Sequence, residues 1–326
     1  MNIEITNIAN NIDYKIFDPT GNITALVETV VETDQQAKIS AEIMRMHPEV
    51  EQVGFVSFDS DGSEDSRDKE QAAHVRLRMA GGEFCGNATM SAAAFFLIRR
   101  AAGENNESMG TVLFDSSDIS ASDISGAGET VYVRASGVSE AVRVELRRRA
   151  DAEYEAAVLM PPALSIENNL MKLSFMGQPA SDRGAAGQMS ETLVPIVHMP
   201  GIDHIVVTQD SALYGLSSRR DSAADVIREI CKGTGSECLG MMFLREDNGK
   251  STVKYELKPL VYVPGVDTVF WENSCASGTA AVGMYLAARD GRKTDISVAE
   301  PAGTMRVTSD PETGETWLSG TTKMIR

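Results

Sequence analysis

Hydrophobic residues in the first half of the chain follow two kinds of pattern, which predicts a mixture of strands and helices. Short apolar runs rich in β-branched residues at 23–27, 53–58 and 75–79 are typical of strands. Between the first two runs, Ile39 and Ile43 recur at helical spacing. An alanine-rich apolar run then follows, with the length and composition of a second helix. The order predicted is strand, helix, strand, strand, helix.

The boundaries of the first helix are marked by two residues with known preferences. Asp34 is the predicted N-cap, because aspartate accepts hydrogen bonds from the first free amides of a helix. Pro48 closes the segment, because proline cannot continue a helix. Met46 lies on the same apolar face as Ile39 and Ile43, so this face is predicted to be buried.

The second half of the chain repeats the same order, which indicates an internal duplication. From Gly21 to Cys85 is 64 residues, and from Gly201 to Cys275 is 74 residues. Each interval opens on a glycine turn and ends at a cysteine that begins an alanine-rich run. The elements predicted in between are a strand at 202–207, a helix at 223–231, a strand at 239–244 and further strands within 253–270.

The length of the chain, 326 residues, exceeds what one hydrophobic core commonly holds, so we predict two domains. The boundary is placed near residue 150, giving domains 1–150 and 151–326, and the last few residues are expected to return to the first domain. Strands at 130–133 and 142–146 are predicted to end the first domain, and strands at 297–299, 305–308 and 316–319 to complete the second. Three polar segments, 59–73, 107–129 and 178–191, are expected to be surface insertions.

The charge of the chain excludes some classes of partner. Its 30 basic and 47 acidic residues give a formal net charge of -17, which repels phosphate backbones and anionic membranes on average. No apolar run approaches the roughly 20 residues of a membrane span, and the N-terminus does not resemble a secretory signal. We expect a cytoplasmic protein with a small-molecule substrate, no nucleic acid and no membrane partner. The basic run 147–149 is expected to be a solvated strand end.

The four cysteines divide into two pairs. Cys231 and Cys238 lie in a helix-like and a strand-like stretch, and are expected to be buried core thiols. No cysteine or histidine spacing matches a zinc site, so no metal is predicted. Cys85 and Cys275 each open an alanine-rich helix. A thiol at a helix N-terminus lies at the positive end of the helix dipole, which favours its thiolate form.

The paired cysteines predict an acid and a base that act on one substrate. Two helix N-termini that meet in one cleft would hold a carboxylate and favour negative charge developing on it. A thiolate can then remove the proton next to the carboxylate while a thiol returns a proton on the opposite face, which inverts the carbon. Residues predicted to contact the substrate around the two cysteines are Gly86, Asn87, Ser277, Gly278 and Thr279.

These motifs resemble those of the diaminopimelate epimerase-like fold, which includes proline racemase and the phenazine-biosynthesis isomerases. Cys85-Gly86-Asn87 matches the first Cys-Gly-Asn motif of diaminopimelate epimerase, and Cys275-Ala276-Ser277-Gly278 resembles its second motif, Cys-Gly-Ser-Gly. Gly21-Asn22 resembles the early Gly-Asn whose asparagine contacts substrate. The resemblance implies an α+β protein of two similar domains, each with a β-sheet wrapped around a central helix. It also implies an active site in the cleft between the domains and a racemase or epimerase that needs no cofactor.

Departures from the family pattern bear on the substrate. Ile202 stands where the family's Gly-Asn-Pro-His has an asparagine, and Met79 stands where another substrate-binding asparagine is expected. The Glu-Arg pair expected before Cys275 is also missing. Those groups bind the distal end of diaminopimelate, so that substrate is disfavoured. The pattern resembles more closely the histidine racemases of staphylopine-type metallophore pathways, which implies histidine as the substrate.

Four further residues are candidates for substrate binding, each with a structural alternative. Asn22 is a predicted substrate contact, against the role of a turn residue. Glu83 and Glu272 precede the two cysteines and are predicted to bind substrate or tune the thiol, against capping helix amides. His204 is a candidate contact, against a structural histidine on a strand.

Other functions remain open at this point. A diaminopimelate epimerase, a proline racemase-like enzyme or a phenazine-type isomerase would use the same fold, although the phenazine-type isomerases lack the cysteine pair. A carboxylate-binding protein without catalysis would need only the two helix N-termini. The sequence also leaves open a homodimer and does not say which cysteine acts on which enantiomer.

Overall fold

The computed structural model describes residues 12–58, 73–104, 128–173, 190–247 and 255–326. Contacts divide the chain into two compact units, residues 1–160 with 317–326, and residues 161–316. The sequence placed the boundary near residue 150. Because the strands on either side of that residue form one hairpin, the division in the structure comes after the second of them.

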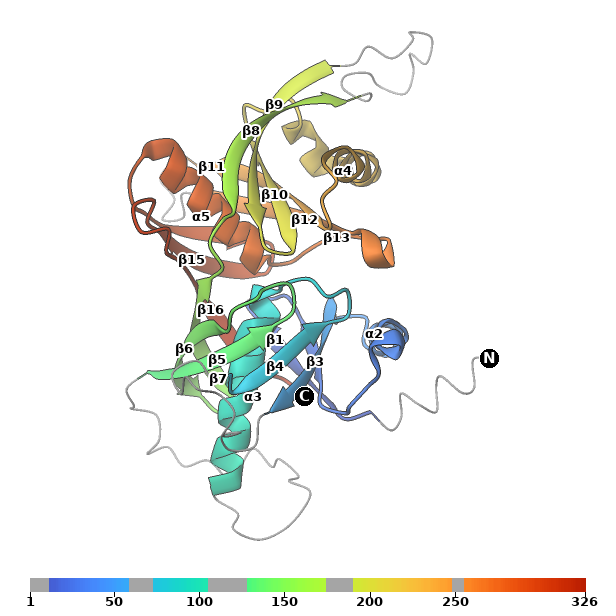
Figure 1. The fold of residues 1–326 in the computed structure, drawn as a ribbon, viewed down its shortest axis with the longest axis vertical. Helices are drawn as coiled ribbons and strands as arrows, with labels where there is room; N and C mark the ends of the chain where they lie inside the picture. The colour runs from blue at the N-terminus through green and yellow to red at the C-terminus, as the bar shows by residue number, and fades with distance from the viewer. Residues whose placement is uncertain (1–11, 59–72, 105–127, 174–189, 248–254) are drawn as a thin grey trace. The chain divides into compact units, whose positions relative to one another are not determined.

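The first unit is a closed sheet around one helix (Figure 1). Its strands are β1 (Tyr14–Pro19), β2 (Thr24–Val27), β3 (Gln52–Phe58), β4 (Val75–Met79), β5 (Glu129–Ala135), β6 (Val142–Ala150), β7 (Glu153–Met160) and most of β16 (Thr316–Met324), and its helices are α2 (Thr33–Met46) and α3 (Gly86–Glu104). Strands β1 to β7 pair in chain order, and β16 pairs with both β7 and β1, which closes the sheet. Helix α3 contacts all seven strands β1 to β7. Every residue of its first ten is buried, as expected of a helix that is apolar on all sides.

The second unit is a sheet covered by a helix on each face (Figure 1). Its elements are β8 (Ser165–Leu173), β9 (Ser190–Met199), β10 (Ile202–Thr208), α4 (Arg220–Thr234), β11 (Leu239–Glu246), β12 (Tyr255–Val263), β13 (Thr268–Trp271), α5 (Ala276–Asp290), β14 (Thr294–Glu300) and β15 (Gly303–Ser309), with short 3-10 helices at Tyr214–Ser218 and Pro264–Val266. The strand order is β15-β14-β12-β11-β10-β9-β8, and β13 pairs with β12. Successive residues of a strand point to opposite faces. In β10, Ile205 therefore faces α4 and His204 faces the side of α5.

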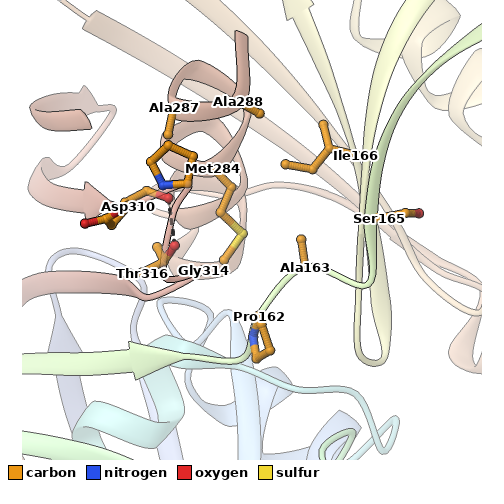
Figure 2. A pocket seen from close by; sticks show the side chains of 12 residues that line it. Pro162, Ala163, Ser165, Ile166, Met284, Ala287, Ala288, Asp310, Gly314 and Thr316 are labelled. Atoms are coloured by element: carbon orange, nitrogen blue, oxygen red, sulfur yellow. Dashed lines mark hydrogen bonds between the residues drawn. The ribbon is translucent and has the colours of Figure 1, made fainter. Parts of the chain in front are cut away.

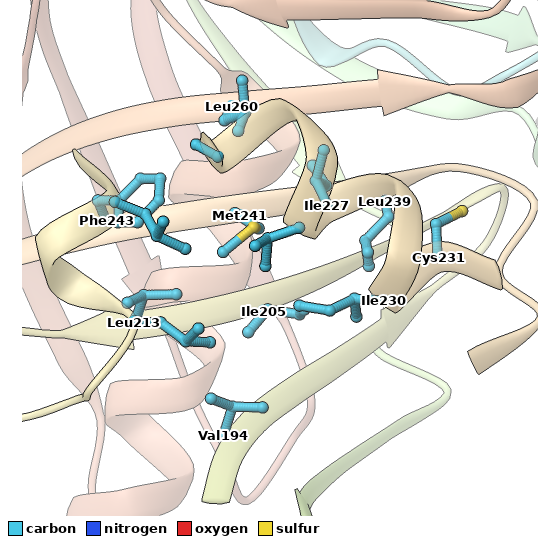
Figure 3. Packing of buried hydrophobic residues seen from close by; sticks show 14 of the residues in the cluster. Val194, Ile205, Leu213, Ile227, Ile230, Cys231, Leu239, Met241, Phe243 and Leu260 are labelled. Carbon is cyan, nitrogen blue, oxygen red and sulfur yellow. The ribbon is translucent and has the colours of Figure 1, made fainter. Parts of the chain in front are cut away.

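The α4 face holds a hydrophobic core of ordinary aliphatic packing (Figure 3). Ile227, Ile230 and Cys231 of α4 contact a cluster that includes Ile205 and Met241 of the sheet. Burying each such aliphatic side chain stabilises the fold by about 1.5 to 3 kcal/mol. Cys231 and the second predicted core thiol, Cys238, are 3% and 6% exposed, so their prediction as buried residues is confirmed.

The two alanine-rich helices and the strands that the pattern identified are present, with some differences from the prediction. The strand predicted at 316–319 to complete the second domain lies in the first unit from Trp317 onward, because it pairs with β7 and β1. Asp34 is not the N-cap: α2 begins at Thr33, its N-cap is Glu32, and Asp34 lies in the first turn, where its charge still favours the helix dipole. Strand β1 was not predicted, and neither were β8 and β9. The predicted insertions at 59–73, 107–129 and 178–191 lie almost entirely outside the described residues.

The basic run 147–149 lies at the end of β6, as predicted. Arg147 and Arg149 pair with Glu155 on the neighbouring strand, and Arg148 pairs with Asp151. Exposed ion pairs of this kind contribute only about 0 to 1 kcal/mol. In the part of the chain that the structure describes, no helix is both long and apolar enough to span a membrane.

Candidate active site

Each unit presents one cysteine at the start of its buried helix, as predicted. Cys85 directly precedes α3, and Cys275 is the N-cap residue of α5. The backbone N–H of Ala88 donates to Sγ of Cys85 at 3.4 Å, and the N–H of Gly278 donates to Sγ of Cys275 at the same distance. Both thiols therefore occupy the same place, beside the first free amides of a helix, where negative charge is favoured.

A chain of hydrogen bonds fixes the surroundings of the Cys85 thiol. The thiol donates to Oε1 of Gln52 at 3.0 Å, and Nε2 of Gln52 donates to Oγ1 of Thr24 at 2.8 Å. The Thr24 hydroxyl donates in turn to the backbone oxygen of Asn22 at 3.0 Å. The buried Asn22 is thereby connected to the cysteine. The Gln52 carbonyl, rather than its amide nitrogen, is held toward the sulfur.

Gln52 was not identified from the sequence. It is the first residue of β3 and is adjacent to Thr24 in the parallel pairing of β2 and β3. Only that register brings it to a cysteine 33 residues further along the chain.

The segment before Cys85 is held in place by the turn after β5. Ser136 donates through its hydroxyl to the backbone oxygen of Glu83 at 2.7 Å and accepts the N–H of Met79 at 3.0 Å. A Cβ at Gly137 would lie 2.4 Å from the backbone nitrogen of Phe84, so only glycine allows this approach. Within the described residues, Oε2 of Glu83 is buried with no hydrogen-bond partner. Burial raises the pKa of the Glu83 carboxyl.

The Cys275 thiol lies in a more acidic place. It is 4% exposed, and burial, followed by the charge and hydrogen bond of Glu272 and the charge of Glu300, raises its pKa well above the ordinary value. The helix start favours the thiolate of Cys275 as expected, through the amide of Gly278, but the net direction of the pKa shift is upward. The single amide hydrogen bond from Gly278 is outweighed by desolvation and by two carboxyl groups.

Glu300 is a second residue that the sequence analysis missed. It ends β14, and its Oε2 accepts the backbone N–H of Cys275 at 2.6 Å. Its Oε1 accepts a hydrogen bond from the hydroxyl of Thr279. The residue is 8% exposed, and burial raises its pKa to about 8.

The remaining predicted residues of the second motif pack closely around the thiol. The hydroxyl of Ser277 lies 3.7 Å from Sγ of Cys275. A Cβ at Gly278 would lie 2.1 Å from the sulfur of Met242 and 3.1 Å from Sγ of Cys275. Any larger residue at this position would have to displace the Met242 side chain and press on the Cys275 sulfur.

His204 is fully buried on the α5 side of the sheet. A Cβ at Gly240, the residue paired with it on β11, would lie 2.3 Å from its Nδ1. Neither ring nitrogen has a hydrogen-bond partner among the described residues. Burial lowers the pKa of His204 to about 3, so the ring is neutral at physiological pH. Its role as a substrate contact stays a prediction.

The predicted site residues thus form two clusters, one in each unit. Each cluster contains a thiol at a helix start, backbone amides beside it and a carboxyl group. The first contains Asn22, Glu83, Cys85, Gly86 and Asn87, and the second contains His204, Glu272, Cys275, Ser277, Gly278 and Thr279. Among the described residues, no group of three or more His, Cys, Asp or Glu is placed to hold a metal ion.

A cavity of about 220 Å³ lies elsewhere in the second unit, near the end of α5 (Figure 2). Met284 and Ala287 of α5 line it, with Pro162, Ile166 and Asp310. Asp310 accepts the N–H of Glu312 and so stabilises its own turn. No predicted site residue lines this cavity, and we assign no part of the site to it.

Comparison with known proteins identifies relatives over most of the chain. The profile of the family described as "Histidine racemase CntK N-terminal domain" matches residues 11–319. A histidine racemase of Fusobacterium nucleatum subsp. nucleatum is 27% identical over 282 residues, covering 84% of this chain and 81% of that protein. A histidine racemase of Staphylococcus aureus is 26% identical over 300 residues, covering 91% and 88%.

Solved structures with the same fold include two kinds of enzyme. A hydroxyproline epimerase from Agrobacterium vitis with bound trans-4-hydroxy-L-proline superposes with a TM-score of 0.56 at 12% identity, covering 97% of this chain and 91% of that one. A phenazine biosynthesis protein of the PhzF family from Bacillus anthracis gives a TM-score of 0.53 at 12% identity, covering 97% of each chain. At this identity the likeness shows the fold alone. The match over residues 11–319 shows more: the chain belongs to the histidine racemase CntK family, a family of racemases and thus of isomerases.

Proposed function

We propose that this protein racemises histidine without a cofactor, with Cys85 and Cys275 as the two proton-transfer groups. The observation that carries the proposal is the repeated helix start. In each unit a thiol receives a backbone N–H at 3.4 Å from the residue three positions later. We propose histidine as the substrate because the relatives from Fusobacterium nucleatum and Staphylococcus aureus are both named histidine racemases.

The reaction requires the α-proton of histidine to leave from one face and another proton to arrive at the opposite face. One cysteine, as thiolate, takes the α-proton and becomes a thiol. The other cysteine, as thiol, gives its proton to the carbanion and becomes a thiolate. The pair returns to its starting state through the reverse reaction or through proton exchange with solvent. Such positioned proton transfer contributes about 10²- to 10⁴-fold per group.

The helix starts stabilise the charge that develops between these two steps. When the α-proton leaves, negative charge spreads onto the substrate carboxylate. Backbone amides of Gly86, Asn87 and Ser277 are the donors we assign to it, because amides at helix starts favour bound anions. They need no rearrangement, since each helix is fixed within its own buried core.

Charged and polar groups around the thiols fit a substrate that brings its own cation. We assign the substrate ammonium or imidazole to Glu83, whose buried Oε2 has no partner among the described residues. Glu272, whose charge and hydrogen bond raise the pKa of the Cys275 thiol, is the group that we assign to exchange a proton with it. Asn22 and His204 are assigned as further substrate contacts.

The architecture proposed for this reaction is that of the family. Two similar domains, each with a sheet wrapped around its cysteine helix, would place the substrate in the cleft between them. The closed sheet around α3 and the packing of α5 on its sheet support the first part. We also propose a cytoplasmic location, where the thiols stay reduced, and a homodimer as the form in solution.

Solvent deuterium exchange tests the proposed function directly. L- and D-histidine are each incubated with the protein in deuterated water without pyridoxal phosphate or metal, beside diaminopimelate and proline. We expect deuterium at the α-carbon and formation of the opposite enantiomer with histidine. Cys85→Ser and Cys275→Ser should each lower racemisation by at least about 10²-fold, whereas Cys231→Ala should retain it. Exchange with none of these amino acids would refute the proposal.

A further inference from the structure

Glu300 distinguishes the two cysteine sites from each other. We propose that Glu300 is a positioning residue that anchors the start of α5 and makes the Cys275 thiol the harder of the two to deprotonate. This inference rests on the proposed function for its kinetic test. Its structural basis is independent of the substrate.

Glu300 contacts the start of α5 through both of its carboxyl oxygens. Glu300 binds the N-cap residue of α5 through the N–H of Cys275 and the first turn through the hydroxyl of Thr279. Both carboxyl oxygens are therefore occupied, each by a group that directs a hydrogen toward it. A carboxyl group that accepts two such hydrogen bonds fixes the backbone of the residue that carries the thiol.

The corresponding threonines of the two units have different hydrogen-bond acceptors. Thr89 and Thr279 stand at the same distance after their cysteines, and both are fully buried. The hydroxyl of Thr89 donates to the backbone oxygen of Cys85 at 2.8 Å, whereas that of Thr279 donates to Glu300. The strand after α3 ends near a neutral group, Ser136, which binds the segment before Cys85. The start of α5 is thus held by the carboxyl group of Glu300, whereas the segment before Cys85 is held by the hydroxyl of Ser136.

Glu300 also acts electrostatically on the Cys275 thiol. Among the described residues, the groups that act on Glu300 are Cys275 and Thr279 from α5 and Glu272 from the segment before it. Burial raises the pKa of Glu300 to about 8, and the pKa of Cys275 lies well above the ordinary thiol value. Glu300 therefore ionises first as the pH rises. Its charge then opposes the loss of the thiol proton.

Replacing Glu300 by glutamine separates charge from shape. The amide oxygen can still accept the N–H of Cys275, and the amide nitrogen can donate to the Thr279 hydroxyl, while the charge is removed. The Cys275 pKa should fall, because the charge of Glu300 is one of the causes that raise it, after burial and Glu272. A residue that only supports the fold would lower the rate without moving the pH dependence.

The experiment is solvent deuterium incorporation from L- and D-histidine between about pH 6 and pH 10, for the wild type and Glu300→Gln. Cys275→Ser first identifies the enantiomer that Cys275 deprotonates, because its exchange is the one that is lost. For that enantiomer, Glu300→Gln should raise the exchange rate at about pH 9 by about tenfold, since one pKa unit is tenfold in thiolate. The other enantiomer, for which Cys275 is the thiol that donates, should not gain in rate at this pH.

Glu256→Gln is the matched control. It makes the same change on β12 at the residue paired with Ala299 of β14, and its carboxylate forms a half-exposed ion pair with Arg245. This control should leave both pH profiles unchanged. Equal profiles for Glu300→Gln and wild type, or an equal rise in rate at about pH 9 for both enantiomers, would overturn the inference.

A second measurement does not depend on the folding of the variant. Alkylation of wild-type protein is followed by peptide mass spectrometry as the pH is raised, with Cys231 and Cys238 as internal references. Cys85 should react at lower pH than Cys275, and the reverse order would overturn the inference. If wild-type protein exchanges none of the amino acids, the proposed function fails, while the shift of Cys275 alkylation to lower pH in Glu300→Gln still tests Glu300.

Discussion

The two cysteine sites have the same backbone arrangement at a helix start and differ in the side chains that surround the sulfur. Both thiols accept an amide three residues later in a buried helix. The Cys85 thiol faces the amide carbonyl of Gln52, whereas the Cys275 thiol faces Glu272 and lies beside Glu300. The two units therefore supply the same backbone position for a thiol, and the side chains around each position make the surroundings of the two thiols different.

The largest expected effect comes from the third residue after each cysteine, which is Ala88 in the first unit and Gly278 in the second. Gly278→Ala should lower activity by about 10²-fold, because the new Cβ meets Met242 and Cys275 and displaces the thiol. Steady-state racemisation with circular dichroism of the fold measures this. Ala88→Gly is the control, and should cost about 1 kcal/mol of helix stability with activity kept within a few-fold.

Rescue sharpens that prediction. Met242→Val shortens the side chain that a Cβ at Gly278 would contact. Combined with Gly278→Ala, it should restore part of the lost activity. If the double variant is no better than Gly278→Ala, the space beside Met242 is not what requires glycine.

A smaller effect is expected from making the first site resemble the second. Gln52→Glu gives the Cys85 thiol a carboxyl partner like that of Cys275, so the Cys85 pKa should rise by about 1 unit. Racemisation near pH 7 should fall by about tenfold and recover as the pH is raised. Rates across pH measure this, with the partly exposed Gln35→Glu as control. Activity that falls equally at every pH would show that Gln52 serves only as a structural link to Thr24.

The smallest effect concerns stability, and it has opposite signs for two buried groups of the second unit. The pKa of Glu300 is raised from 4.5 to about 8, so this carboxyl stays protonated to a higher pH in the folded state than in the unfolded state. The free energy of unfolding therefore falls as the pH rises through that range. The pKa of His204 is lowered from 6.5 to about 3, so stability falls as the pH drops from 6.5 toward 3. Each slope is at most about 1.4 kcal/mol per pH unit.

Urea unfolding at several pH values tests this. Glu300→Gln should flatten the alkaline side of the stability profile and leave the acid side unchanged. An unchanged alkaline slope would mean that Glu300 is ionised in the folded protein throughout this range.

The elements found from the sequence share one property, a strong local signal. The alanine-rich runs after Cys85 and Cys275 are apolar on every side, and a helix of that kind must be buried. Strand β8 gave no such signal, because its polar residues Glu167, Asn168 and Asn169 interrupt the apolar pattern. It forms by pairing along its whole length with β9, which is a tertiary effect.

The sequence by itself determined that two thiols begin two buried helices, because helix starts and apolar runs are local properties of the chain. The tertiary structure alone decided which side chains meet those thiols. Gln52 lies 33 residues from Cys85, and Glu300 lies 25 residues from Cys275. Parallel strand register and the return of β14 beside α5 bring them there, and neither leaves a periodic pattern in the sequence. Those long-range contacts complete the surroundings of each thiol.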